Sequence, residues 1–225
     1  MRISIFIFFI FSFILIISCK YDIIEQAQTP VASECNNLPN CSGNGVGEYC
    51  TFGYKWGSDN PFTIAGYEKP GPSKGKIQVS YKFIDTGFTF NTHSQNDVKS
   101  IAFNEIVSCS KQTIRESFAE WESNADIQFV EKTGNDQSDI KLIIANITQG
   151  GIGYPPVPQG PCSGLIIFQK FQYTCSSFRI LALHEIGHVL GLGHVNSENV
   201  MNPNKKFLNL QSGDIKGIQS IYGKK

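Results

Sequence analysis

Residues 184–194 have the sequence HEIGHVLGLGH, and this stretch decides most of what the chain can be expected to do. His184 and His188 are four residues apart, so on a helix their side chains lie on one face, one turn apart. Gly191 can adopt the backbone conformation that ends a helix and reverses the chain. His194 can then return to the same point, and three neutral imidazoles with one open position are typical of a catalytic zinc site.

The residues within and before this motif favour a catalytic helix. Glu185 directly follows the first histidine, where its carboxylate can reach a water molecule on the metal. Ser176 or Ser177 is a suitable N-cap before the apolar run. The apolar residues that should face the core are Leu181, Leu183, Ile186, Val189 and Leu190. The alternative is an ordinary buried helix, but the motif fixes five positions and holds three of the four histidines.

The extended pattern H-E-x-x-H-x-x-G-x-x-H resembles the signature of the metzincin zinc endopeptidases. Metzincins carry a tight turn with a Met beneath the metal, and the resemblance implies that Met201 occupies this Met turn. Pro203 stands where astacin-like and serralysin-like enzymes usually have Tyr. Val195 stands where adamalysin-like enzymes usually have Asp. The Met-x-Pro sequence is similar to that of the matrixins.

Four further segments resemble the matrixin catalytic domain. They correspond to its start, first long helix, third strand and final helix, and are Lys55–Trp56, Thr113–Trp121, Ser138–Leu142 and Gly213–Gly223. We therefore expect one catalytic domain over residues 54–225. The resemblance implies a zinc-dependent endopeptidase in which a metal-activated water attacks the peptide bond and Glu185 is the general base. Extracellular or host proteins are the expected substrates.

The hydrophobic pattern predicts alternating strands and helices, and hence an α/β fold of the α+β metzincin type. The expected strands are Ile77–Phe83, Ile127–Val130, Ile140–Ala145 and Leu165–Phe168, with a helix over Ser110–Glu122. The sheet should be twisted and mostly parallel, followed by the active-site helix, the Met turn and a C-terminal helix. In matrixins the equivalent of Leu165–Phe168 is the antiparallel edge strand that binds extended peptides. The alternative is that these residues are merely core.

The N-terminus is expected to direct export. Residues 1–18 form a predicted lipoprotein signal peptide, since their apolar run is shorter than the about 20 residues of a membrane span. The sequence Leu15–Cys19 resembles a bacterial lipobox, which implies lipidation of Cys19 and anchoring to the cell envelope, at the outer membrane or cell surface. Release from the membrane stays open. The alternative is an ordinary signal peptide followed by an unrelated cysteine. Residues 19–53 are expected to be a tether and Cys-rich segment.

The cysteines support this interpretation. The chain has seven, and removing Cys19 leaves an even number, which suits a disulfide-bonded exported protein. Matrixins bind a second, structural zinc through three His and an Asp, but here no His lies between Asp139 and His184. Because this chain departs from the matrixin pattern here, we expect the structural zinc to be absent and a Cys162–Cys175 bond to brace the region instead. Two more bonds, of open connectivity, would join Cys35, Cys41, Cys50 and Cys109.

Other properties stay open at the level of sequence. The zero net charge gives no indication of a nucleic-acid partner, and a monomer is expected. Calcium is left open, because Asp139 and Gly150–Gly153 lie where matrixins bind it but the usual acidic partners are missing. Asn202 leaves the depth of the substrate pocket undefined, and His93 is predicted to be a surface residue. Asp22, Glu25 or a cysteine of the tether could block the zinc.

One alternative function is a non-catalytic surface adhesin on the same scaffold. Such a protein should have lost Glu185 or one of the zinc ligands, and this chain keeps them all.

Overall fold

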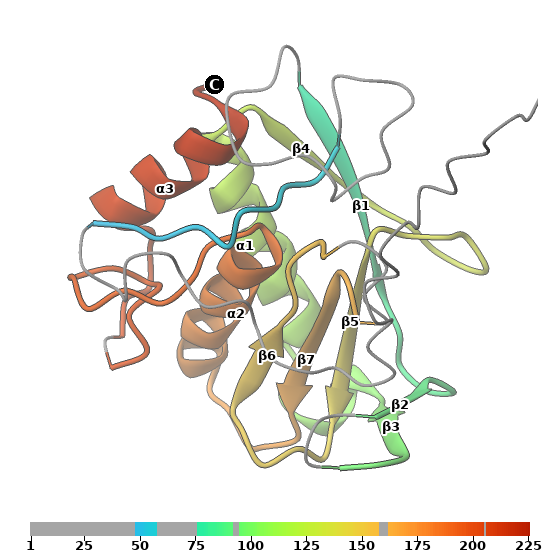
Figure 1. Cartoon of the computed structure of the whole chain (residues 1–225). Helices are drawn as coiled ribbons and strands as arrows, with labels where there is room; N and C mark the ends of the chain where they lie inside the picture. The colour runs from blue at the N-terminus through green and yellow to red at the C-terminus, as the bar shows by residue number, and fades with distance from the viewer. Residues whose placement is uncertain (1–47, 58–75, 92–94, 158–161, 205) are drawn as a thin grey trace, which may run out of the picture. The chain divides into compact units, whose positions relative to one another are not determined.

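The computed structural model describes residues 48–57, 76–91, 95–157, 162–204 and 206–225 (Figure 1). The predicted signal peptide and tether lie largely outside these residues, as do Cys19, Asp22, Glu25, Cys35, Cys41 and His93. The expectations for these residues therefore stay predictions.

The centre of the fold is a seven-stranded mixed sheet. Its strands are β1 (Ile77–Phe83), β2 (Thr89–Phe90), β3 (Val98–Ile101), β4 (Ile127–Glu131), β5 (Ile140–Ala145), β6 (Gly151–Gly153) and β7 (Leu165–Gln169). β1 pairs in parallel with β4 and β5, and β5 pairs in parallel with β7. β6 is antiparallel to β7, and β3 joins β2 and β5 through antiparallel pairs. The predicted α/β class and mostly parallel sheet are confirmed.

The prediction that Leu165–Phe168 forms the antiparallel edge strand is wrong. β7 lies between β5 and β6 and runs parallel to β5, with Leu165 opposite Lys141. The antiparallel edge is β6, whose Ile152 lies opposite Ile167. The first four residues of β7 are all buried, as expected of an interior strand covered on both faces.

Three helices lie on one side of the sheet (Figure 1). They are α1 (Ser110–Asn124), α2 (Cys175–Val189) and α3 (Ser212–Tyr222), and a short 3-10 helix, η1 (Phe103–Glu105), precedes α1. Successive side chains of β5 point to opposite faces. Leu142 and Ile144 pack in the core shared with the helices, whereas Ile143 belongs to a smaller apolar cluster on the other face. In the described part of the chain, no helix has the length and apolar character needed to cross a membrane.

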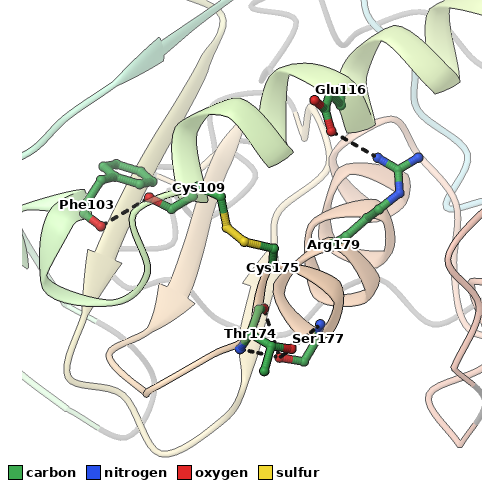
Figure 2. Close-up of a disulfide and its surroundings, with 8 residues drawn as sticks. Phe103, Cys109, Glu116, Thr174, Cys175, Ser177 and Arg179 are labelled. Carbon is green, nitrogen blue, oxygen red and sulfur yellow. Dashed lines mark hydrogen bonds and ion pairs between the residues drawn. A yellow bond between two sulfur atoms is a disulfide. The ribbon is translucent and has the colours of Figure 1, made fainter.

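A disulfide joins the beginnings of α1 and α2 (Figure 2). Cys109, the N-cap of α1, is bonded to Cys175, the first residue of α2, with 6.0 Å between their Cα atoms. The predicted Cys162–Cys175 bond is therefore wrong, and so is the expectation that Cys109 bonds to Cys35, Cys41 or Cys50. Cys162 and Cys175 lie beyond opposite ends of β7, which at about 3.3 Å per residue is too long for a disulfide to bridge. Cys50 and Cys162 each take part in a disulfide as well.

The start of α2 differs in one further detail from the prediction. The N-cap is Thr174, not Ser176 or Ser177. Its Oγ1 accepts a hydrogen bond from the Ser177 backbone N–H at 3.1 Å, and the Ser177 hydroxyl oxygen accepts one from the Thr174 N–H at 3.0 Å. This reciprocal capping box is visible in Figure 2 and satisfies donors that the first helical turn leaves without partners.

Candidate active site

The three histidines of the motif converge on one point. Nε2 of His194 lies 3.0 Å from Nε2 of His184 and 3.0 Å from Nε2 of His188. In the described part of the chain, they form the only group of three or more His, Cys, Asp or Glu side chains placed to share a metal ion. The structure therefore brings together all three predicted ligands.

Backbone carbonyls fix the orientation of two of these rings. His184 Nδ1 donates to the Val200 carbonyl at 2.7 Å, and His188 Nδ1 donates to the Leu192 carbonyl at 2.8 Å. Because a carbonyl only accepts, each Nδ1 carries the proton of a neutral ring, and each Nε2 presents a lone pair. Ligating histidines are usually oriented by such partners.

The convergence of these nitrogens fits zinc. Lone pairs that face one another at 3.0 Å repel unless a cation or a shared proton lies between them, and one proton on His194 can serve only one neighbour. Zn–N bonds of about 2.0–2.1 Å in a tetrahedral site place nitrogens roughly 3.3 Å apart, close to the observed separation.

Burial keeps the histidines neutral. Desolvation lowers the pKa of His184 to about 4, with a smaller lowering contribution from His194. The pKa of His188 lies well below its usual value because of burial and then the two neighbouring rings, and burial also lowers the pKa of His194. The rings therefore carry no positive charge at neutral pH, as metal-ligating histidines must.

Gly191 makes the turn that returns His194 to the site, as predicted. Its φ of 104° is favourable for glycine, and a Cβ there would lie 2.6 Å from the Tyr54 carbonyl oxygen. The Gly191 N–H donates to the His188 carbonyl and the Leu192 N–H to the Gly187 carbonyl, both at 2.9 Å. These two bonds form a Schellman motif, which ends α2 and reverses the chain.

Glu185 lies beside the histidines and is 4% exposed. Its Oε2 has no hydrogen-bond partner within the protein. Desolvation raises the pKa of this carboxyl to about 8, opposed in part by the Gly153 backbone N–H. A Cβ at Gly151 would lie 2.7 Å from Glu185 Oε1, so glycine lets β6 approach α2 this closely. A buried carboxylate with one unpaired oxygen is suited to take up a proton.

The predicted Met turn lies directly beneath α2. Met201 is buried, and a Cβ at Gly187 would collide with its sulfur atom. The Val195 N–H donates to the Met201 carbonyl at 3.2 Å, which ties the turn to the segment after His194. The turn therefore supports the helix that carries His184 and His188.

Asp214 holds this turn, a role that the sequence did not indicate. The carboxylate is buried, and its Oδ2 accepts hydrogen bonds from the backbone N–H groups of Val200 and Gln211, both at 2.8 Å. Its Oδ1 accepts from the Met201 N–H at 3.1 Å. Burial raises the pKa of Asp214, and the backbone donors act against this. An acidic residue at the third position of a helix is a capping signal, and it could have identified part of this role.

Comparison with known proteins agrees with this geometry. Residues 167–223, which span α2, the Met turn and α3, match the family model described as Matrixin. This part of the chain, which holds the three histidines and Met201, is similar to the matrixins.

Plant and animal relatives extend the similarity. Metalloendoproteinase 4-MMP of Arabidopsis thaliana is 29% identical over 136 residues, covering 50% of this chain and 40% of that protein. Metalloendoproteinase 1 of Glycine max is 30% identical over 139 residues, covering 50% and 45%. Matrix metalloproteinase-19 of Homo sapiens is 28% identical over 138 residues, covering 52% and 26%. The chain thus spans less than half the length of these relatives.

The cleft beside the three histidines has a volume of about 360 Å³. It lies between β6, the exposed face of α2 and the segment after the Met turn. Besides the three histidines and Glu185, its lining comprises Gln149, Gly150, Gly151, Ile152, Ser177, Ile180, Leu181, Val200, Asn202, Pro203 and Lys206. A mostly apolar wall next to the three histidines is suited to a substrate side chain.

Asp139, which lies where matrixins bind calcium, has hydrogen-bond partners within the protein. Its Oδ2 accepts hydrogen bonds from the Ser80 N–H at 2.8 Å and the Ser80 hydroxyl at 2.6 Å. These bonds tie the start of β5 to β1. Calcium binding stays an open question.

Proposed function

We propose that this chain is a zinc-dependent endopeptidase. The observation that carries the proposal is the convergence of three imidazole Nε2 atoms beside the buried Glu185 carboxylate, in an open cleft. His184, His188 and His194 would hold the metal. When bound, zinc would supply Lewis acidity, which makes a water molecule more acidic and polarises a peptide carbonyl.

Glu185 moves the proton in this proposal. Its partnerless Oε2 accepts a proton from the attacking water and then passes it to the nitrogen of the leaving amine. A cation at the histidines favours the ionised carboxylate, which offsets the effect of burial on its pKa. The Gly153 N–H helps to keep the carboxylate oriented.

The edge of β6 is proposed to bind the peptide. Gly150 and Tyr154 bond to β7 through their backbone groups, so the backbone groups of Gly151 point away from β7. An extended peptide can pair with such an edge. The apolar wall formed by Ile180, Leu181, Val200 and Pro203 would then receive one apolar side chain.

A cleavage profile tests this function. Full-length mature protein, loaded with one zinc per chain, is incubated with a mixed peptide library, and the products are identified by mass spectrometry. We expect internal cleavage that stops when the zinc is chelated and resumes when it is restored. Zinc-loaded protein that cleaves no peptide of the library would overturn the proposal.

Export and anchoring are a separate part of the proposal. We infer from the lipobox-like sequence ending at Cys19 that the mature chain is lipid-anchored to the bacterial cell envelope. We further propose that it acts as a monomer and cleaves extracellular or host proteins. Metabolic labelling with a fatty acid tests the anchor. Label should appear on the wild type and not on Cys19→Ser, and equal labelling of both would contradict it.

A further inference from the structure

Residues 48–56, here called the N-terminal strap, lie along the turn that carries the third histidine. The Phe52 N–H donates to the Gly191 carbonyl at 2.8 Å, and the Gly193 N–H donates to the Cys50 carbonyl at 3.0 Å. Between these bonds, Thr51 and Leu192 form an antiparallel bridge. The strap is drawn in blue in Figure 1, where it passes beside α3 and the end of α2.

The strap also completes the end of α2. A helix leaves its last carbonyls without partners inside the helix. The Trp56 indole N–H donates to the Val189 carbonyl at 2.8 Å. The Tyr222 hydroxyl donates to the Leu190 carbonyl at 3.0 Å and accepts a hydrogen bond from the backbone N–H of Trp56 at 3.1 Å. Three consecutive carbonyls, those of Val189, Leu190 and Gly191, are thus bound by the strap or by α3.

The beginning of the strap is fastened separately. Asn199 is buried, and its Nδ2 donates to the Glu48 carbonyl at 2.6 Å, while its Oδ1 accepts from the Gly213 N–H at 3.1 Å. The Glu48 carboxylate pairs with Lys216 at 2.6 Å. A Cβ at Gly213 would collide with the Glu48 carbonyl, so glycine permits this close approach to α3.

We propose that the strap positions His194 and thereby sets the affinity of the site for zinc. His184 and His188 are fixed by α2 itself, whereas His194 lies after Gly191 in non-helical backbone. Within this turn, Gly193 is bound to the strap through its N–H. The Phe52 ring also lies 5.8 Å from the His188 ring, between centroids. Without the strap, the turn that carries His194 loses these hydrogen bonds, so the His194 ring is held less firmly at the metal site.

The zinc dissociation constant tests this inference. It is measured by competition with a chromogenic chelator on the full mature chain, for wild type and Trp56→Phe. We expect Trp56→Phe to bind zinc about 10-fold more weakly, the lower range for loss of a group that orients a ligand. The visible spectrum of the cobalt-substituted protein should change as well, because the third ligand is displaced.

The chain offers a matched control. Trp121 also donates its indole N–H to a carbonyl of α2, that of Leu183, at 3.2 Å. Trp121→Phe removes the same group from the middle of the helix, so it should destabilise the fold while leaving the zinc affinity within about twofold. Equal affinities of Trp56→Phe and wild type, or equal losses in both variants, would overturn the inference.

A second variant covers the case in which Trp56→Phe does not fold. Asn199→Asp keeps an acceptor for the Gly213 N–H but loses the donor to Glu48, and should weaken zinc binding in the same direction. Unchanged affinity in this variant counts against the strap. The inference rests on the proposed metal site but needs no substrate. Protein whose zinc affinity depends on the strap as described, but which cleaves no peptide, contradicts only the peptidase proposal.

Discussion

The carboxylate of Asp214 binds the backbone N–H of Val200 at 2.8 Å, and the carbonyl of Val200 accepts the Nδ1–H of His184 at 2.7 Å. A side chain of α3 therefore orients a candidate zinc ligand on α2 through one residue of the Met turn. This connection explains how residues outside the H-E-x-x-H motif control its geometry.

Asp214→Asn tests that connection. The amide nitrogen cannot accept the backbone N–H groups that the carboxylate binds, so we expect the free energy of unfolding to fall by about 1–3 kcal/mol. Zinc affinity should fall too, because His184 loses a fixed partner. Urea denaturation and chelator competition measure the two effects. Asp85→Asn is the control, since it breaks a partly exposed pair with Lys111 and should cost at most about 1 kcal/mol. An Asp214→Asn protein as stable as wild type contradicts the connection.

The buried Glu185 should make the stability of zinc-free protein depend on pH. Burial raises its pKa from 4.5 to about 8, so the folded chain holds this proton more tightly than the unfolded chain. This contribution is complete below pH 4.5 and is lost as the pH rises through 8. The melting temperature should therefore fall between about pH 6.5 and 9 in wild type, and fall less in Glu185→Gln. A melting temperature that depends on pH in the same way in both proteins would count against this effect of Glu185.

The lowered histidine pKa values act in a different window. Neutral His184 stabilises the fold above its ordinary pKa of 6.5, and this is lost as the pH falls toward about 4. The comparison of wild type with Glu185→Gln above pH 6.5 therefore isolates the effect of Glu185 from that of His184.

The glycine at position 151 should be needed for catalysis and not for metal binding. Gly151→Ala places a Cβ 2.7 Å from Glu185 Oε1, so the carboxylate must shift. We expect kcat to fall by about 10-fold or more, in line with the usual contribution of general acid–base catalysis, with one zinc per chain retained. The neighbouring Gly150→Ala is the control, because its Cβ would meet only Leu181, at 3.9 Å. Similar rates for the two variants would show that β6 does not control Glu185.

The Cys109–Cys175 bond should stabilise the packing of α2 on α1. It joins residues separated by 66 positions, and removing both cysteines as Cys109→Ser/Cys175→Ser should cost about 2–4 kcal/mol. Arg179 of α2 also pairs with Glu120 of α1 at 2.5 Å and contacts Glu116, as Figure 2 shows for Glu116, and these contacts would remain without the disulfide. Non-reducing peptide mapping gives the connectivity directly. Recovery of a peptide that links Cys162 to Cys175 would refute the assignment.

Local patterns in the sequence predicted local structure well. Ile77–Phe83 alternates and Ile140–Ala145 is apolar except for Lys141, and the structure has strands with these bounds. The turn at Gly191 and the meeting of the three histidines also follow from spacing along one short segment. Helical and extended backbones fix which side chains share a face, so such predictions need no long-range information.

Contacts between distant segments could not be predicted in the same way. The edge strand Gly151–Gly153 is too short and glycine-rich to carry a periodic signal, and the matrixin resemblance implies an edge at the neighbouring Leu165–Phe168 instead. The partner of Cys175 depends on how α1 and α2 pack. The strap bonds at Gly191 and Gly193 run between backbone groups, which leave no trace in residue identity.

The central claim is that the three histidines and Glu185 form a peptidase site in which Glu185 moves the proton. The most direct test compares wild type and Glu185→Ala, each with one zinc per chain, on the same peptide substrate. We predict that Glu185→Ala keeps its zinc and that kcat falls by about 100-fold or more. Cleavage by zinc-loaded Glu185→Ala at the wild-type rate would contradict the account.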